Sequence, residues 1–342
     1  DGGCPVLLTE PQSTNLITNS EDFSNSSWTK VNATITSNYS TSIFGTTTSF
    51  LLTSTSASAA NINKSISSSN NTQTYFVKKG NHSFVQILDF GGVEMYANFD
   101  LNNGVVGSFG SASTAYIKEL SNGWYKISCY FTGTTSKTNL YIAESNASAY
   151  GGGNIPIGAT IEISAAQLEE LSYATSYIPT YGSVRTRLQD TVTGAGTVSD
   201  FNSTEGVLFV EMENAYQSAV TRGWSLVSVA NNGSDLVAIR FSSSQNISFY
   251  LRANGITTIN SDIAAPASGF LKIAIKYKSG DNALWINGVE VYTDAIPFTF
   301  NSPLATLGSN DGLGGFGYFK IKQTQVFKTA LTDFELTQLT TI

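Results

Sequence analysis

Histidine is almost absent from this chain, since His82 is the only one in 342 residues. A single imidazole excludes a zinc site built from several histidines and leaves a Ser-His-Asp triad without support. His82 lies in a Gly-Asn-His-Ser segment, which indicates a surface turn between strands. The sequence also has no Gly-x-Ser-x-Gly elbow and no phosphate-binding loop. These absences argue against several common kinds of enzyme.

Charge is scarce as well. Charged residues make up 13% of the chain, and the formal net charge is −7. Because phosphate binding needs clustered Lys and Arg, a nucleic-acid partner is not expected. No apolar stretch approaches the roughly 20 residues that span a bilayer, so membrane insertion is not expected either. Serine, threonine and asparagine fill the polar positions, which is typical of extracellular β proteins.

Cysteine occurs only twice, at Cys4 and Cys129. Neither has the spacing of a metal ligand. Cys129 alternates with Ile127 and Phe131, which predicts that its side chain points inward. We expect two unpaired thiols, with a Cys4–Cys129 disulfide as the alternative. The chain begins without methionine, which indicates a processed start that continues an upstream segment.

Alternation with period two is the dominant pattern that is present. In Leu271–Lys278 the odd positions are apolar and the even positions are mostly lysine, as in an antiparallel strand with one buried face. Asn287-Gly288 between two apolar runs predicts a hairpin. Further strands are predicted at residues 75–77, 84–88, 93–99, 161–164, 207–212, 236–241, 247–251 and 319–327. Many short strands separated by Gly-, Asn- and Ser-rich turns predict sandwiches or barrels.

One helix is predicted, at the C-terminus. Thr332 and Glu335 have the spacing of a capping box, and Leu336 and Leu339 share the face that follows. The predicted fold class is therefore all-β, with two antiparallel β-sandwich (jelly-roll) domains and a short C-terminal helix.

The polar, Gly-rich stretch at 179–205 indicates the domain boundary, which we place near Gly182. The predicted organisation is an N-terminal arm at 1–15, a first sandwich at 16–182 and a second at 183–342. Residues 6–8 of the arm are apolar, so we expect them to pack as an extended segment on the first sandwich or on a neighbouring subunit.

Several sequence motifs resemble those of known families. The first half contains Asn15-Leu16-Ile17-Thr18-Asn19-Ser20-Glu21-Asp22-Phe23, Tyr75-Phe76-Val77-Lys78-Lys79-Gly80, Asn122-Gly123-Trp124-Tyr125 and Ala166-Gln167-Leu168-Glu169. It resembles the jelly-roll, carbohydrate-binding-module-like domains of phage tail and surface proteins. The second half contains Trp285-Ile286-Asn287-Gly288-Val289 and Ala330-Leu331-Thr332-Asp333-Phe334-Glu335-Leu336. It resembles laminin-G-like, concanavalin-type domains.

The resemblance implies an extracellular, non-catalytic binding protein on a virion, or alternatively on a bacterial cell surface. Its expected partner is a glycan or host receptor, together with other virion or fibre subunits in a homo-oligomer. The alternative is a purely structural decoration or spacer protein of a virion. A polysaccharide-active glycosidase is a further alternative, because Glu211 and Glu213 alternate on one strand face. Their surroundings depart from the concanavalin-type glycanase pattern Glu-x-Asp-x-x-Glu, so we expect a solvated strand face and no enzyme activity.

Jelly-roll modules of this type often hold a structural calcium ion. The resemblance places it at Glu21, Asp22 and Gln167; we expect no other cofactor. Sugar rings stack on exposed aromatic faces while amides and charged groups bind their hydroxyls. Candidate glycan-binding residues on that basis are Tyr96, Tyr150, Asn154, Tyr216, Arg222, Asn310 and Asp311. Trp28, Trp124 and Trp285 are expected to be structural.

Overall fold

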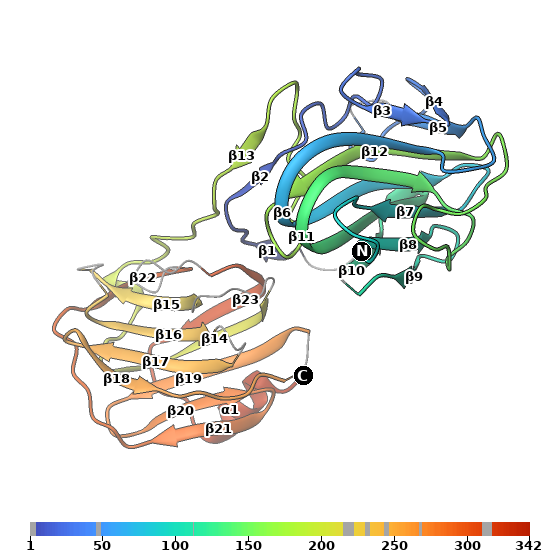
Figure 1. Cartoon of the computed structure of the whole chain (residues 1–342). Coiled ribbons are helices and arrows are strands. Elements are labelled where there is room, and N and C mark those ends of the chain that lie inside the picture. Colours follow the sequence, from blue (N-terminus) through green and yellow to red (C-terminus); the bar gives the residue numbers. More distant parts are fainter. Residues whose placement is uncertain are drawn as a thin grey trace. The chain divides into compact units, whose positions relative to one another are not determined.

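The computed structural model describes residues 5–45, 49–111, 113–214, 222–229, 233–242, 246–266, 269–309 and 317–342. The fold in these ranges is all-β with one short α-helix at the C-terminus, as predicted (Figure 1). All strand pairs in this part of the chain are antiparallel, which follows from the alternating apolar and polar positions.

The chain divides into two compact units. The N-terminal unit comprises residues 12–188, and the C-terminal unit comprises residues 5–11 together with 189–342. The chain therefore passes between the units twice, at 11–12 and at 188–189.

The N-terminal unit is a jelly roll whose two layers share two long strands. These are β6 (Asn61–Lys79) and β11 (Trp124–Ile142), each of 19 residues, drawn as long curved arrows in Figure 1. Register shifts in β11 at Phe131/Thr134 and Thr135/Lys137 mark where it bends from one layer into the other.

In one layer, the first part of β11 and the second part of β6 pair with β10 (Ser113–Glu119) and β12 (Thr160–Glu169); β5 (Phe50–Ser54) and β4 (Ala33–Thr36) complete it. In the other, the remaining halves pair with β3 (Thr29–Val31) and β7 (Phe84–Leu88), followed by β8 (Tyr96–Asp100) and β9 (Val105–Phe109). A single turn of 3-10 helix, η1 (Ser121–Gly123), precedes β11.

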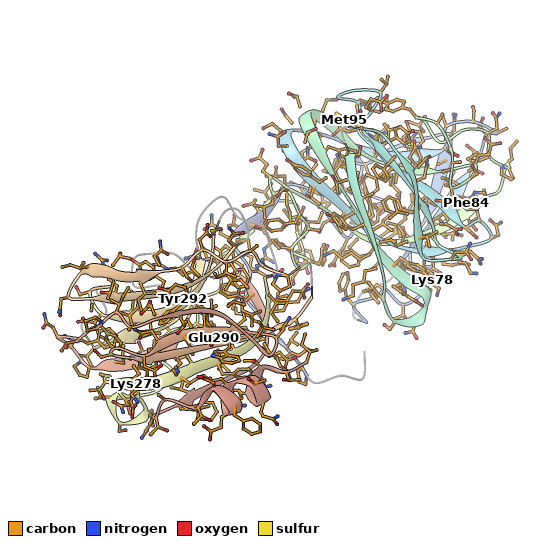
Figure 2. The ribbon with its side chains drawn as sticks, turned by 90° about the horizontal axis from the view of Figure 1, so that it is seen from below. Lys78, Phe84, Met95, Lys278, Glu290 and Tyr292 are labelled. Atoms are coloured by element: carbon orange, nitrogen blue, oxygen red, sulfur yellow. The ribbon has the colours of Figure 1, made fainter. Side chains whose placement is uncertain are left out.

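Apolar side chains from both layers fill the space between them (Figure 2). Trp28, Tyr75 and Phe131 are among the largest fully buried side chains of this core. Cys129 lies in it as a free, fully buried thiol, as its strand position predicted. Burial raises the pKa of this thiol, so it stays protonated and unreactive. Cys4 lies outside the described residues.

The C-terminal unit is a sandwich of a six-stranded and a five-stranded sheet. The six-stranded sheet contains β1 (Leu7–Leu8), β23 (Phe319–Phe327), β14 (Glu205–Asn214), β19 (Leu271–Lys278), β20 (Asn282–Ile286) and β21 (Val289–Asp294). The five-stranded sheet contains β18 (Ile256–Asn260), β17 (Ile247–Ala253), β16 (Leu236–Phe241), β15 (Arg222–Ser228) and β22 (Leu304–Gly308). A 3-10 turn, η2 (Val198–Asp200), precedes β14.

Helix α1 (Asp333–Thr340) begins at the predicted capping box. The backbone N–H of Glu335 donates to the Thr332 hydroxyl, and the Glu335 carboxylate accepts from the backbone N–H of Thr332. Leu336 is fully buried against Phe209 and Trp285 on the outer face of the six-stranded sheet. No helix in the described ranges is both long enough and apolar enough to span a membrane.

The N-terminal segment, predicted as an arm at 1–15, is divided between the two units in its described part. Leu7 and Leu8 pair with Ile321 and Lys320 of β23 in the C-terminal unit, and not with the first sandwich or a neighbouring subunit as predicted. Five residues after Leu8, β2 (Ser13–Asn15) begins, and it pairs with β13 (Arg185–Arg187) in the N-terminal unit. Leu7 and Leu8 form the edge strand of the six-stranded sheet, next to β23. Pro5, which precedes them, is tolerated there because an edge strand needs fewer N–H donors.

Candidate functional site

Two of the predicted tyrosines lie in contact on the surface of the N-terminal unit. The rings of Tyr96 and Tyr150 pack edge to face, with their centroids 6.3 Å apart. Phe90 also packs edge to face with Tyr150, with the ring centroids 6.5 Å apart. Phe90 is 48% exposed, and the two tyrosines are partly exposed. We call these three residues the aromatic cluster.

Phe90 belongs to a tight turn between β7 and β8. The backbone N–H of Asp89 donates to the carbonyl of Met95, which closes the turn at its two ends. Gly91 follows Phe90, and a Cβ atom there would lie 2.1 Å from the carbonyl oxygen of Thr134, so only glycine fits. The residue pattern predicts a strand over 93–99, but β8 begins at Tyr96 because residues 91–95 form this turn.

Tyr150 is held by a buried amide. The Gln86 side chain, fully buried on β7, donates to the carbonyl of Ala149 and accepts from the backbone N–H of Gly151, which brackets Tyr150 on both sides. Asn98 on β8 adds a third bond to the same loop, from its amide to the carbonyl of Ser148. The loop is therefore fixed to the outer face of the sheet.

The buried carboxylate of Asp89, next to Phe90 in sequence, accepts several hydrogen bonds. It accepts hydrogen bonds from the Gln73 amide at 3.0 Å and from the backbone N–H of Gly91 at 2.9 Å. Burial raises the pKa of Asp89, while the hydrogen bonds, including those from Thr135 and Ser136, act in the opposite direction. Asp89 thus joins the turn that carries Phe90 to the bend of β11.

One cation lies at the rim of the aromatic cluster. The ammonium of Lys137 lies 5.5 Å from the centroid of the Phe90 ring, within the range of a cation–π contact. Lys137 comes from β11, directly after its second register shift. Rings that expose their faces beside a cation form a surface suited to a sugar ligand.

The other predicted glycan-binding residues do not join this cluster in the described structure. Asn154 is exposed in the loop that carries Tyr150, but its backbone bonds to the Glu144 carboxylate and bridges to Ser58. Tyr216, Asn310 and Asp311 lie outside the described residues, as does the side chain of Arg222, whose backbone begins β15.

The predicted calcium ligands take part in local hydrogen bonds. The Gln167 amide oxygen accepts from the backbone N–H of Ile178 at 2.7 Å, and the Asp22 carboxylate accepts from the backbone N–H groups of Ser24 and Asn25. Burial raises the pKa of Glu21, against the effect of its hydrogen bond with Tyr177. In the described ranges no three His, Cys, Asp or Glu side chains gather as a metal site. A calcium ion at Glu21, Asp22 and Gln167 stays a prediction.

The paired carboxylates on β14 each bind a lysine of β23. Glu211 lies 2.9 Å from the ammonium of Lys322, and Glu213 lies 2.9 Å from that of Lys320. Partial burial alone would raise the pKa of Glu211, but hydrogen bonds from Lys322 and Gln323 hold it below its ordinary value. A glycosidase acid needs the opposite shift.

His82 has a structural role in its turn. Its ring Nε2 lies 2.6 Å from the carbonyl oxygen of Ala143, and the ring packs edge to face on Phe84. Trp28, Trp124 and Trp285 are buried, as expected for structural residues.

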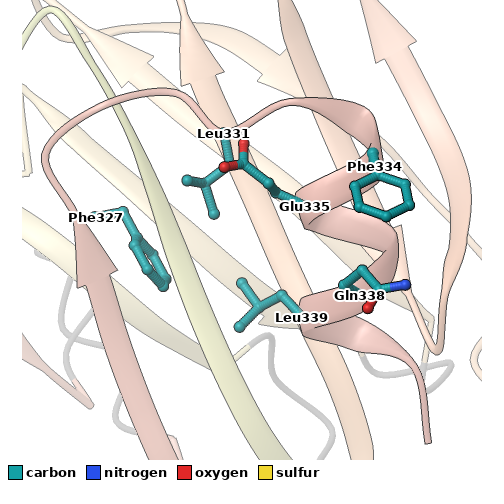
Figure 3. A pocket seen from close by; sticks show the side chains of 6 residues that line it. All are labelled: Phe327, Leu331, Phe334, Glu335, Gln338 and Leu339. Atoms are coloured by element: carbon teal, nitrogen blue, oxygen red, sulfur yellow. The ribbon is translucent and has the colours of Figure 1, made fainter.

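A surface hollow of about 410 Å³ lies beside α1 (Figure 3). It is lined by Phe327, Leu331, Phe334, Glu335, Gln338 and Leu339. Its one carboxylate, that of Glu335, is engaged in the helix cap, so the hollow lacks a free charged group that could orient a ligand. The aromatic cluster is therefore the stronger candidate site.

The sequence did not predict Phe90, Lys137, Gln86 or Asp89 as site residues. The only local signal was an aromatic residue directly before the pair Gly91-Gly92, which places it in a turn. The remaining residues are brought together by strand register across some 50 residues, which sequence patterns do not encode.

No family model and no curated protein matches this chain. Among solved structures, the CBM40 domain of Ruminococcus gnavus IT-sialidase is similar, with 17% identity, 43% of this chain and 93% of that chain covered, and a TM-score of 0.35. Domains LG4-5 of the mouse laminin alpha1 chain are 9% identical, with 77% and 86% covered and a TM-score of 0.29. The SAP-like pentraxin of Limulus polyphemus is 13% identical, with 43% and 73% covered and a TM-score of 0.35. Likeness at this level does not assign a function.

Proposed function

We propose that this chain is a non-catalytic, extracellular glycan-binding protein of a virion or cell surface, and that its N-terminal unit binds sugar through the aromatic cluster. The observation that carries the proposal is the packing of Phe90, Tyr96 and Tyr150 into one partly exposed surface. Stacking on aromatic faces is a general mode of sugar recognition because the C–H face of a pyranose is apolar.

Buried hydrogen bonds support the aromatic cluster from below. Two loops and three buried side chains hold the rings in place through the hydrogen bonds of Gln86, Asn98 and Asp89. A surface fixed before the ligand arrives loses little conformational entropy on binding. A purely structural spacer gives no reason for such an arrangement, so the cluster favours a binding role over the spacer alternative.

The test is a glycan array probed with the full chain, followed by titration calorimetry on the strongest ligand. Phe90→Ala should weaken binding about tenfold, corresponding to the loss of one stacking contact of about 1.4 kcal/mol. Tyr116→Ala is the matched control, because Tyr116 lies on β10 and is 58% exposed. Equal affinities for both variants and the parent would refute the site.

The non-catalytic part of the proposal needs its own assay. Each glycan bound on the array is incubated with the chain, and new reducing ends are measured. We expect none, because both β14 carboxylates are paired with lysines. Hydrolysis that Glu211→Gln or Glu213→Gln abolishes would show that the protein is a glycosidase.

A further inference from the structure

Lys137 projects toward the surface that carries the aromatic cluster. Its neighbour Thr138 is fully buried, and its hydroxyl lies 2.6 Å from that of Tyr75 in the core. Since successive residues of a strand point to opposite faces, Lys137 lies on the outer face, where its ammonium reaches the Phe90 ring.

The charge of Lys137 is not neutralised by the protein. Other lysines take part in ion pairs, among them Lys78, Lys276, Lys278, Lys320 and Lys322. Others donate to oxygen atoms, as Lys64 does to the Ser27 hydroxyl and Lys126 to the carbonyl of Thr175. Within the described residues Lys137 has neither kind of partner, and its contact is the face of Phe90.

The two acids of the turn that carries Phe90 are engaged in hydrogen bonds. The carboxylate of Asp89 lies beneath the cluster, fully buried, and accepts from Gln73 and Gly91. The carboxylate of Glu94 accepts from the backbone and side chain of Ser111. The ammonium of Lys137 is therefore left for a ligand, at the edge of a surface suited to a sugar ring.

We propose that the ligand of the aromatic cluster is an acidic glycan, whose sugar ring stacks on Phe90 and Tyr150 and whose anionic group binds Lys137. This inference rests on the proposed glycan-binding function and adds the class of sugar. The anion is a carboxylate or a sulfate, because a lysine ammonium is a compact point charge that binds either without the planar geometry that arginine demands. The cation–π contact with Phe90 holds the ammonium in place beside the ring.

Two matched pairs of oligosaccharides test the inference and separate the two anions. The first pair is an oligogalacturonate and its methyl-esterified form; the second is a carrageenan oligosaccharide and its desulfated form. We expect the full chain to bind the acidic member of at least one pair about tenfold more tightly than the neutral member, with a preference that weakens as salt is raised.

Variants of Lys137 identify the residue responsible. Lys137→Met keeps the length of the side chain and should abolish the preference, whereas Lys137→Arg should retain it. Melting curves of both variants should lie close to that of the parent, because the ammonium makes no ion pair or hydrogen bond in the described ranges and its exposed cation–π contact with Phe90 is weak. Lys118 is another surface lysine and lies on β10. Lys118→Met should leave the preference for the acidic member unchanged.

The outcomes distinguish this inference from the function on which it rests. Equal binding of acidic and neutral members, or a preference that survives Lys137→Met, overturns the acidic ligand. If Phe90→Ala weakens that binding, the glycan-binding function is supported and only the acidic class of the ligand is rejected. If no member of either pair binds, the acidic ligand is also overturned, and neutral ligands from the array then decide the proposed function through Phe90→Ala.

Discussion

The hydroxyl of Tyr150 donates a hydrogen bond to the backbone carbonyl of Asp89 at 3.1 Å. This bond fastens the ring of one loop to the turn that carries Phe90, so the two loops cannot separate without breaking it. Burial raises the pKa of Tyr150, and the nearby Asp89 carboxylate adds to the effect, so the phenol remains a donor at physiological pH.

Tyr150→Phe should show how much of the affinity depends on the hydrogen bond that positions the ring, since the aromatic face itself is kept. The variant keeps the aromatic face and loses the bond to Asp89, so glycan affinity should fall about threefold to tenfold. The melting temperature should change little, because the ring stays packed. Calorimetry against the best array ligand measures the affinity, with Tyr116→Phe as the control on an exposed tyrosine. An unchanged dissociation constant would mean that the bond does not position the ring.

The raised pKa of Asp89 predicts a pH dependence of stability. A carboxyl group whose pKa is raised by folding binds its proton more tightly in the native state, so its contribution to stability is complete below its unfolded pKa of about 4. That contribution is lost as the pH rises through the raised native value. The parent should therefore lose stability relative to Asp89→Asn from about pH 4 upward.

Melting curves of the parent and Asp89→Asn at matched pH values measure this effect. The difference between the two proteins cancels most other titrating groups, including Glu21, whose pKa is also raised. A difference that stays constant from about pH 3 to pH 7 would contradict the assignment.

Lys276 should anchor α1 to the six-stranded sheet. Its side chain is 7% exposed, and its ammonium lies 2.8 Å from Asp281 and 3.3 Å from Asp333 in the first turn of α1. Lys276→Met should destabilise the C-terminal unit by roughly 1 to 2 kcal/mol, because the acids are exposed but the lysine is buried. Lys278→Met is the matched control two residues along the strand. Its lysine is exposed, its 3.8 Å pair with Glu205 is only partly shielded from solvent, and its loss should cost less than about 0.5 kcal/mol.

The contribution of Lys276 should vanish in strong alkali. Burial acts to lower its pKa, but the two carboxylates outweigh burial and raise it above 10.5. A raised lysine pKa gives stability that is complete below the unfolded value and lost as the pH rises through the native value. The melting difference between the parent and Lys276→Met should hold at neutral pH and shrink above about pH 10.5. A difference independent of pH would show that packing, not charge, provides the stability.

Thr9 should matter for the stability of the C-terminal unit despite its distance in sequence from most of that unit. Its buried hydroxyl accepts from the backbone N–H of Phe319 at 2.8 Å and donates to the carbonyl of Gly317 at 2.9 Å. Thr9→Val leaves both groups unpaired and should cost about 2 kcal/mol in chemical denaturation. Thr14→Val, which removes an exposed hydroxyl contact with Thr186, should have little effect. Equal stability of the two variants would contradict this role.

Sequence patterns predicted the strands best where one face is apolar and the other charged. The bounds of β19 and β23 match their predicted ranges because alternation is regular there. The bounds of β16 also match, although all of its residues are buried and the signal was a short apolar run. Strand β6 was predicted only at 75–77, because its first part is a run of Asn, Ser and Thr without alternation. Some of those polar residues are buried and hydrogen-bonded to one another, as Asn63 is to Asn61. Composition does not indicate that polar residues will be buried in this way.

The candidate site was predictable only in part, for a related reason. Tyr96 and Tyr150 could be selected as aromatic residues at a strand and a loop, but their contact depends on the Gln86 and Asn98 amides that fold the loop onto the sheet. The role of Lys137 depends on a bend in β11 that places it beside a turn 47 positions earlier in the chain. Such proximity is a property of the register between strands.

The pairing of Leu7 and Leu8 with β23 sets an order on biosynthesis. Thr9 and its partner Phe319 are 310 residues apart, so the first strand leaves the ribosome long before the edge it joins exists. The 12–188 unit contains all of its own strands and can fold while translation continues, whereas the other sandwich must wait for its last strand to be made. During that interval the apolar residues at 6–8 stay exposed to solvent, to chaperones and to other nascent chains. A chain whose translation ends before residue 319 would carry a complete 12–188 unit, while β1 would lack the strand with which it pairs.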